Sequence, residues 1–187
     1  VNDPTSYASR RGLPNCCDQL QVLGVHTDGG LRESFNLPAR KLHSSTSLNY
    51  EQLALVETLA IGCHAVDRVK PISEENVLVI GAGPIGLATM VFLRLIGCRV
   101  IVADFNEQRL QFCSEYMGVD STIAGGDGIH DRIRAACGGN LADVVIDATG
   151  HNGSMSDACE MLAPGGRLCF VGITTKQVSF THAALHK

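Results

Sequence analysis

Residues 81–86 read Gly-Ala-Gly-Pro-Ile-Gly, and their three glycines have the GxGxxG spacing of a phosphate-binding turn. The motif directly follows a short apolar run, Val77–Ile80, and opens a segment with helical periodicity, Ile85–Ile96. Alone, this spacing describes any Gly-rich turn that joins a strand to a helix. Between a strand and a helix it is typical of dinucleotide binding, so the context favours a pyrophosphate site.

Each glycine of the motif has its own physical task. Gly81 permits the tight turn, Gly83 lets the backbone approach a pyrophosphate, and Gly86 allows the helix to pack closely on the strand. The free N–H groups and the positive end of the helix would then face the anion. The candidate phosphate-binding residues are Gly81, Gly83, Pro84, Ile85 and Gly86.

Asp104 stands at the end of the next apolar run, about 20 residues beyond the turn, where dinucleotide-binding proteins carry an acidic residue. Its carboxylate can accept both hydroxyls of an adenosine ribose, and it would repel the 2′-phosphate of NADP. The alternative is a hydrated carboxylate at the end of a strand. Arg109, one helical turn further on, either flanks the adenine or is an ordinary hydrated helix residue. Together these residues predict NAD as the cofactor.

Two later apolar runs also end in segments of small residues, 147–150 and 171–173. Open parallel sheets bind ligands at the carboxyl ends of their strands, so both segments lie where a cofactor is expected. Thr149 is a candidate for contacting the cofactor ribose, and the backbone of Gly172 and Ile173 for holding the nicotinamide amide. The alternative is that all three are ordinary loop residues.

These candidates need a parallel sheet to bring them together, and the chain from Asn76 onward has the pattern of one. Short runs rich in Val and Ile alternate with helical segments, and the runs lack polar alternation because helices are expected to cover both faces. The pattern predicts an α/β fold with a doubly wound parallel Rossmann sheet. The expected strands are Val77–Ile80, Arg99–Ala103, Ser121–Ile123, Asp143–Asp147 and Leu168–Val171. The expected helices are Ile85–Ile96, Glu107–Met117 and Gly153–Leu162.

A further helix, Glu51–Val69, is expected to open the cofactor domain, which we assign to residues 49–187. Asn49 is a plausible N-cap for this junction helix, and Gln52 follows three residues later to complete a capping box. Pro71 ends the helix.

Residues 1–48 have a different pattern, with short extended pieces at Leu20–Val25 and Ser34–Leu37 separated by Gly, Pro, Ser and Thr. Such a segment is too small to bury a core by itself. We therefore expect a partial, mostly β remnant of a second, catalytic domain.

The composition excludes several classes of function. A formal net charge of −4 over 187 residues argues against a nucleic-acid surface, and no apolar run is long enough to span a membrane. Eight scattered cysteines without a CxxC pair indicate reduced thiols in a cytoplasmic protein. The chain begins at Val1 without a signal peptide, and we expect a truncated start.

Several stretches together resemble the zinc-type medium-chain dehydrogenases, especially the branch that acts on polyols, sugar acids or threonine. Their order and spacing cover nearly the whole chain, and they assign residues 1–48 to the GroES-like catalytic domain of that family. The stretches are Arg-Arg-Gly-Leu-Pro-Asn-Cys-Cys at 10–17, Leu-Gly-Val-His-Thr-Asp-Gly-Gly at 23–30, Val-Glu-Thr-Leu-Ala-Ile-Gly-Cys-His-Ala-Val at 56–66, and the turn at 81–86.

The resemblance implies hydride transfer from a secondary alcohol, a polyol or a sugar acid, to NAD, with a catalytic zinc that polarises the alcohol oxygen. It also implies that the complete enzyme is a homo-oligomer. The family takes most zinc ligands from a Cys-containing strand end and a Gly-His-Glu helix start, which this sequence lacks. We therefore expect zinc only in the complete enzyme and no turnover by this chain alone, and we assign it no catalytic residue.

Glu57 is the one position that matches a zinc partner of this branch, which carries Glu there as a direct or water-bridged partner. Its neighbours in Leu53–Ile61 are nearly all apolar, and an ionised carboxylate in such surroundings must be paired, hydrated or bound to metal. The alternative is a buried or boundary glutamate that pairs with an arginine or a backbone donor.

The family also has a structural zinc held by four cysteines, the last of which matches Cys17. Asp3–Ser9 contains no cysteine where three are expected, so we predict free thiols at Cys16 and Cys17 and no structural zinc. We expect His64 to be packed on the junction helix. The other histidines considered are expected in exposed loops, and none is assigned to catalysis: His26, His43 and His151.

Three functions remain to be compared: the NAD-binding part of a dehydrogenase, a cofactor-binding module without catalysis of its own, and a methyltransferase that uses S-adenosylmethionine. Methyltransferases also pair a Gly-rich first turn with an acidic residue after the second strand. Residues 10–17 and 23–30 favour the dehydrogenase, whose partner would be a small-molecule alcohol. The ligand that raises the melting temperature, NAD or S-adenosylmethionine, discriminates between the two enzymes.

Overall fold

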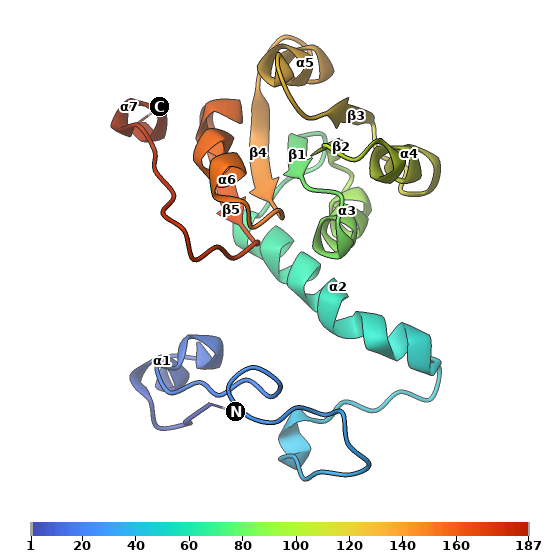
Figure 1. Ribbon diagram of the computed structural model, residues 1–187, viewed down its shortest axis with the longest axis vertical. Helices are drawn as coiled ribbons and strands as arrows, with labels where there is room; N and C mark the ends of the chain where they lie inside the picture. The colour runs from blue at the N-terminus through green and yellow to red at the C-terminus, as the bar shows by residue number, and fades with distance from the viewer. Residues whose placement is uncertain (1, 187) are drawn as a thin grey trace. The chain divides into compact units, whose positions relative to one another are not determined.

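The computed structural model describes residues 2–186, and the chain divides into two compact units, residues 1–47 and 48–187. In the second unit, five parallel strands form one sheet in the order β3-β2-β1-β4-β5 (Figure 1). The strands are β1 (Asn76–Ile80), β2 (Arg99–Asp104), β3 (Ser121–Ala124), β4 (Ala142–Asp147) and β5 (Leu162–Phe170). The helices of this unit are α2 (Tyr50–Val69), α3 (Pro84–Ile96), α4 (Glu107–Tyr116), α5 (Ile129–Ala136), α6 (Asn152–Asp157), the 3₁₀ helix η3 (Ala158–Met161) and α7 (His182–His186).

The strand order reverses beside β1, which confirms the doubly wound α/β fold. Val77 of β1 pairs with Val100 of β2 on one side and with Val144 of β4 on the other. The chain builds outward from β1 to β3 and then returns across the sheet to β4. Such a reversal opens a crevice at the carboxyl ends of the two central strands.

Both faces of the sheet are buried, as the uninterrupted apolar runs predict. Side chains alternate along β1, so Val77 and Val79 join a cluster with residues of α2, α3 and α4. Leu78 and Ile80 point to the opposite face and join a cluster with residues of α5 and η3. The two cores hold β1 rigidly in the centre of the sheet.

The start of α2 has the capping box expected from the sequence. The Asn49 side chain accepts a hydrogen bond from the Gln52 N–H at 2.8 Å, and the Gln52 side chain accepts one from the Asn49 N–H at 3.0 Å. The helix ends at Val69, and Lys70 takes a left-handed conformation before Pro71.

The region between β4 and β5 differs from the sequence prediction. A helix over Gly153–Leu162 was expected, but α6 ends at Asp157, a 3₁₀ turn follows, and Leu162 already belongs to β5. Ala142 pairs with Leu162, and the residues of the Pro-Gly-Gly stretch form an irregularity in the ladder before regular pairing resumes. The Pro-Gly-Gly stretch, which was expected to end a helix, therefore interrupts a strand instead.

Helix α5 was missed because it is short and flanked by glycines. Ile133 on its buried side belongs to the core. Its apolar spacing, Ile129 to Ile133 to Ala136, is helical but covers only two turns, which is little evidence in a sequence.

The short extended pieces expected at Leu20–Val25 and Ser34–Leu37 form no strands in the described part of the first unit, so the mostly β prediction is wrong for residues 2–47. This unit has a short helix α1 (Tyr7–Arg10), two 3₁₀ turns (Pro14–Cys16 and Ala39–Lys41) and one isolated bridge between Leu23 and Thr27. An extended segment becomes a stable strand only when a partner strand and a core stabilise it, and these residues have neither.

None of the helices in residues 2–186 combines the length and the apolar character that a membrane span requires. The eight cysteines are all free thiols, as predicted from their spacing.

Candidate functional site

The turn after β1 has the strained geometry that its glycines were expected to allow. Gly81 has a φ of +100°, a conformation that L side chains rarely adopt, and its N–H donates to the carbonyl of Ala103 at 2.8 Å. A Cβ at Gly86 would collide with the carbonyl oxygen of Gly81. Only glycine at both positions lets α3 start this close to the end of β1.

The amino end of α3 is open in the way a phosphate site requires. Gly83 is the N-cap residue, and no side chain caps the helix. Pro84 occupies the first turn, and helix geometry leaves the N–H groups of Ile85 and Gly86 without an acceptor in the helix. A Cβ at Gly83 would meet no atom within 4 Å, so the space in front of the turn is free for an anion.

Asp104 ends β2 and is bound directly to this turn. Its side chain is 11% exposed, and its carboxylate accepts the N–H of Ala82 at 2.7 Å and the N–H of Asn106 at 2.8 Å. The guanidinium of Arg109 lies 3.9 Å away. Each carboxylate oxygen has two lone pairs, so both can still accept a ligand hydroxyl.

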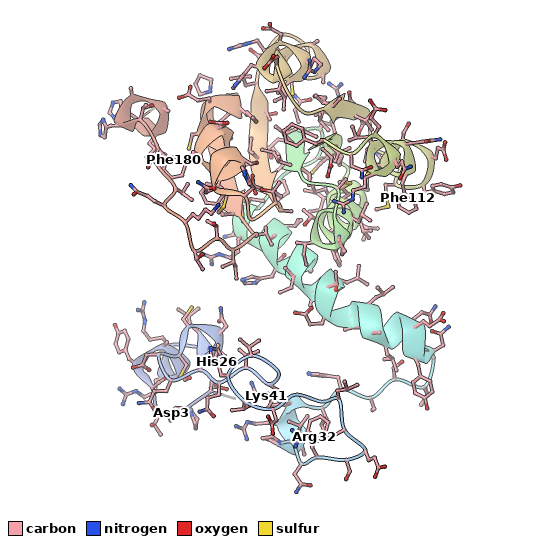
Figure 2. The ribbon with its side chains drawn as sticks, in the orientation of Figure 1. Asp3, His26, Arg32, Lys41, Phe112 and Phe180 are labelled. Carbon is pink, nitrogen blue, oxygen red and sulfur yellow. The ribbon has the colours of Figure 1, made fainter. Side chains whose placement is uncertain are left out.

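A pocket of about 380 Å³ lies between α3 and α4, next to the turn and Asp104. Phe112 lines it from α4, where Figure 2 labels it. Sequence reasoning missed this residue, although it stands one helical turn after Arg109, a spacing that places both on one face. The pocket is lined by Ala82, Pro84, Leu87, Asn106, Arg109 and Phe112, among others.

The segments after β4 and β5 meet each other beside the turn. A Cβ at Gly81 would lie 3.1 Å from the methyl of Thr149, which places Thr149 against the turn. Gly150, with φ +65°, and Gly172 are so close that a Cβ on either would collide with the backbone of the other segment. Ile173 follows, 90% exposed. The structure therefore brings all the candidates except Glu57 to one edge of the sheet.

Asp147, at the end of β4, is the residue that sequence reasoning passed over. It is fully buried, and its carboxylate accepts hydrogen bonds from the N–H and hydroxyl of Thr149 and from the hydroxyl of Ser154. An aspartate at the end of an apolar strand was visible in the sequence, but its burial depends on packing that spacing does not reveal.

Glu57 lies on the amino-terminal half of α2, outside this constellation. Its side chain is exposed, and it makes no hydrogen bond or ion pair with the residues described. Its neighbours Leu55 and Val56 are also exposed, so the carboxylate is hydrated in this structure, and the alternative of a buried, paired glutamate is wrong. His64, expected to be packed, is exposed too, while His26, His43 and His151 are exposed as expected.

The residues present fit one of the two expected cofactors, NAD, better than the other, zinc. The open helix end, the free space at Gly83 and the carboxylate of Asp104 fit a dinucleotide. The described residues do not form a zinc site, because residues 2–186 bring together no group of three or more His, Cys, Asp or Glu side chains that could hold a metal ion.

Comparison with known families agrees with this geometry. The sequence model described as zinc-binding dehydrogenase matches residues 84–187. That match covers more than half of the 187 residues. The chain belongs to the zinc-binding dehydrogenase family.

Two curated relatives are dehydrogenases of sugar acids and polyols. The chain is 34% identical to L-galactonate-5-dehydrogenase of Escherichia coli K12 over 180 residues, which are 96% of this chain and 53% of that protein. It is 35% identical to sorbitol dehydrogenase of Arabidopsis thaliana over 177 residues, 88% of this chain and 47% of that protein. The chain spans about half the length of these relatives.

A solved structure has the same fold over the whole chain. The NADH complex of an alcohol dehydrogenase (RspB) from Escherichia coli CFT073 superposes with a TM-score of 0.91 at 28% identity, and the match covers 100% of this chain and 56% of that chain.

Proposed function

We propose that residues 48–187 bind NAD, as the cofactor-binding part of a zinc-dependent oxidoreductase that oxidises a secondary alcohol of a polyol or a sugar acid. The observation that carries the proposal is the turn itself. A helix end with free N–H groups faces open space at Gly83, and the carboxylate of Asp104 is hydrogen-bonded to the same turn. The NADH complex of RspB supports the choice of ligand.

In this proposal each part of the edge holds one part of the cofactor. The N–H groups of Ile85 and Gly86 bind the pyrophosphate, and Asp104 accepts the hydroxyls of the adenosine ribose. The adenine lies in the pocket beside Phe112 and Arg109. The second ribose and the nicotinamide lie along the segments after β4 and β5, where Thr149, Gly172 and Ile173 are the candidates. Bound NAD supplies the acceptor for a hydride.

The alcohol class is inferred from relatives that act on L-galactonate and sorbitol. The described residues do not assemble a ligand set for zinc, so we expect the metal only in the complete enzyme. We also propose that the complete enzyme is a cytoplasmic homo-oligomer, which light scattering on that enzyme would test.

The 187-residue chain is expected to bind the cofactor without turning over any alcohol. Saturating NAD should raise its melting temperature, because a ligand that binds only the folded state stabilises it, while S-adenosylmethionine should not. Added zinc with sorbitol or galactonate should produce no NADH. A rise in melting temperature with S-adenosylmethionine but not with NAD would favour the methyltransferase. NADH formation by this chain would contradict the expectation that it is inactive alone.

A further inference from the structure

The buried carboxylate of Asp147 lies where three segments of the proposed NAD site meet. Its Oδ1 accepts the N–H of Thr149 at 2.9 Å and the hydroxyl of the same residue at 2.7 Å, while Oδ2 accepts the hydroxyl of Ser154. A charged group buried this completely is tolerated only because it is hydrogen-bonded. Two of its bonds go to Thr149, in the loop that leads from β4 into α6, and the third goes to Ser154 in the first turns of α6.

That loop is also joined to the phosphate-binding turn. The N–H of Ala148 donates to the carbonyl of Ile80, the last residue of β1, at 2.9 Å. The methyl of Thr149 lies against Gly81. Because the carboxylate holds Thr149 through two hydrogen bonds, it also sets how this side chain sits beside the turn.

On its other side the loop supports the segment after β5. The main-chain carbonyl of Asp147 accepts the N–H groups of Val171 at 2.9 Å and Gly172 at 3.2 Å. The backbones of Gly150 and Gly172 touch so closely that neither position has room for a Cβ. A shift of residues 149–150 would therefore displace residues 172–173 as well.

We propose that Asp147 is a positioning residue that fixes the nicotinamide half of the NAD site, an inference that rests on the proposed NAD function. Its side chain is fully buried, so it would act on the cofactor only through its neighbours. It acts through Thr149 and, by way of Gly150, through Gly172 and Ile173. The adenosine half is held by separate contacts, those of Asp104, and does not depend on it.

The test separates the two halves of the cofactor by comparing NAD with AMP, which occupies only the adenosine half. Asp147→Ala removes the acceptor of all three hydrogen bonds. Ser154→Ala removes one of them with little loss of volume, so it answers the question even if the first variant does not fold. Asp143→Ala is the matched control, because Asp143 lies at the opposite end of β4 and its carboxylate accepts the N–H of Asn76 at 2.9 Å.

Dissociation constants for both ligands are measured by NMR titration of the full chain. Losing hydrogen bonds to a buried charge predicts that Asp147→Ala raises the dissociation constant for NAD by about 10–100-fold and Ser154→Ala by about 3–10-fold. The constant for AMP should change by no more than about twofold, which is within the variation expected of independent sites. Asp143→Ala should lower the melting temperature without changing the ratio of the two constants.

Each outcome is informative. If wild type binds NAD and the two site variants weaken NAD and AMP alike, or neither ligand, Asp147 has no positioning role and the proposed function stands. If folded wild type does not bind NAD, the proposed function and the inference both fail.

Discussion

Asp104 has two tasks that one substitution must separate. In the proposed site its charge would repel a 2′-phosphate, and in the structure its oxygens accept the N–H groups of Ala82 and Asn106. Replacing it with alanine would release the phosphate-binding turn as well as remove the charge. Asparagine removes the charge but keeps one acceptor oxygen, so it retains one of the two main-chain hydrogen bonds and disturbs the turn less than alanine does.

We expect wild type to bind NAD more tightly than NADP. In Asp104→Asn the ratio of the dissociation constants for NADP and NAD should fall by about 10-fold or more, because apposed like charges cost several kcal/mol. Calorimetric titration of both cofactors measures it. Asp120→Asn is the control, since Asp120 likewise accepts a main-chain N–H, that of Val100 at 2.8 Å, at a distance from the turn. Equal or tighter binding of NADP by wild type would contradict the assignment.

Glu57 tests how far the resemblance extends at a single residue. In the complete enzyme, Glu57→Gln should lower the zinc content or the rate by about 10–100-fold, the usual scale for outer partners of a metal. Glu51→Gln on the same helix is the control, because it is equally exposed and also loses one charge. Unchanged zinc content and rate would leave Glu57 a hydrated helix residue.

The motif residues could be located from sequence because their spacing is local, within one turn or one βα unit. Gly81, Gly86 and Asp104 lie where the fingerprint predicts. Asp147 and Phe112 could not be found this way, because their importance comes from contacts across the sheet or between helices. The exposure of Glu57 could not be found this way either, because apolar neighbours in sequence do not guarantee burial.

At the scale of elements, the β1–α3 unit was predictable from end to end. Its strand, turn and helix give three independent signals in order, and α3 ends at Ile96 as expected, with Gly97 as its C-cap residue at a φ of +89°. The β4–β5 connection was not predictable, because Pro and Gly indicate a break in regular structure but do not distinguish the end of a helix from an interruption of a strand.

Alanine substitution at two glycines of the turn should change the free energy of unfolding by different amounts. Gly86→Ala puts a methyl into the Gly81 carbonyl and should lower the free energy of unfolding by about 1–3 kcal/mol or more, the range for overpacking. Gly83→Ala fills open space at a permitted conformation and should change it by no more than about 1 kcal/mol. Denaturant unfolding measures both. Similar losses in the two variants would show that the turn is not packed as described.

At the scale of the whole molecule, the core protects most thiols. Burial raises the pKa of five cysteines in the second unit, which lowers their thiolate fraction at a given pH. For Cys113 the charge of Asp104 adds to this effect. The five are Cys98, Cys113, Cys137, Cys159 and Cys169.

We expect a chromogenic disulfide reagent at pH 8 to modify exposed Cys16 first and these five only as the sheet opens. Peptide mapping at successive times identifies the order, and the same reaction in denaturant is the control. Saturating NAD should slow the modification of these five cysteines further, because the ligand stabilises the folded state. Modification of any of them as fast as Cys16 would contradict the packing of the core.

The turn at residues 81–86 is the feature on which the proposed NAD binding depends most directly. Because the chain contains no tryptophan, the fluorescence of NADH can be titrated without interference from indole. We predict saturable binding of about one NADH per chain, competed by AMP and lost in Gly83→Ala, whose methyl occupies the space in front of the helix end. Absence of saturable binding by folded wild type, or equal affinity in Gly83→Ala, would contradict it.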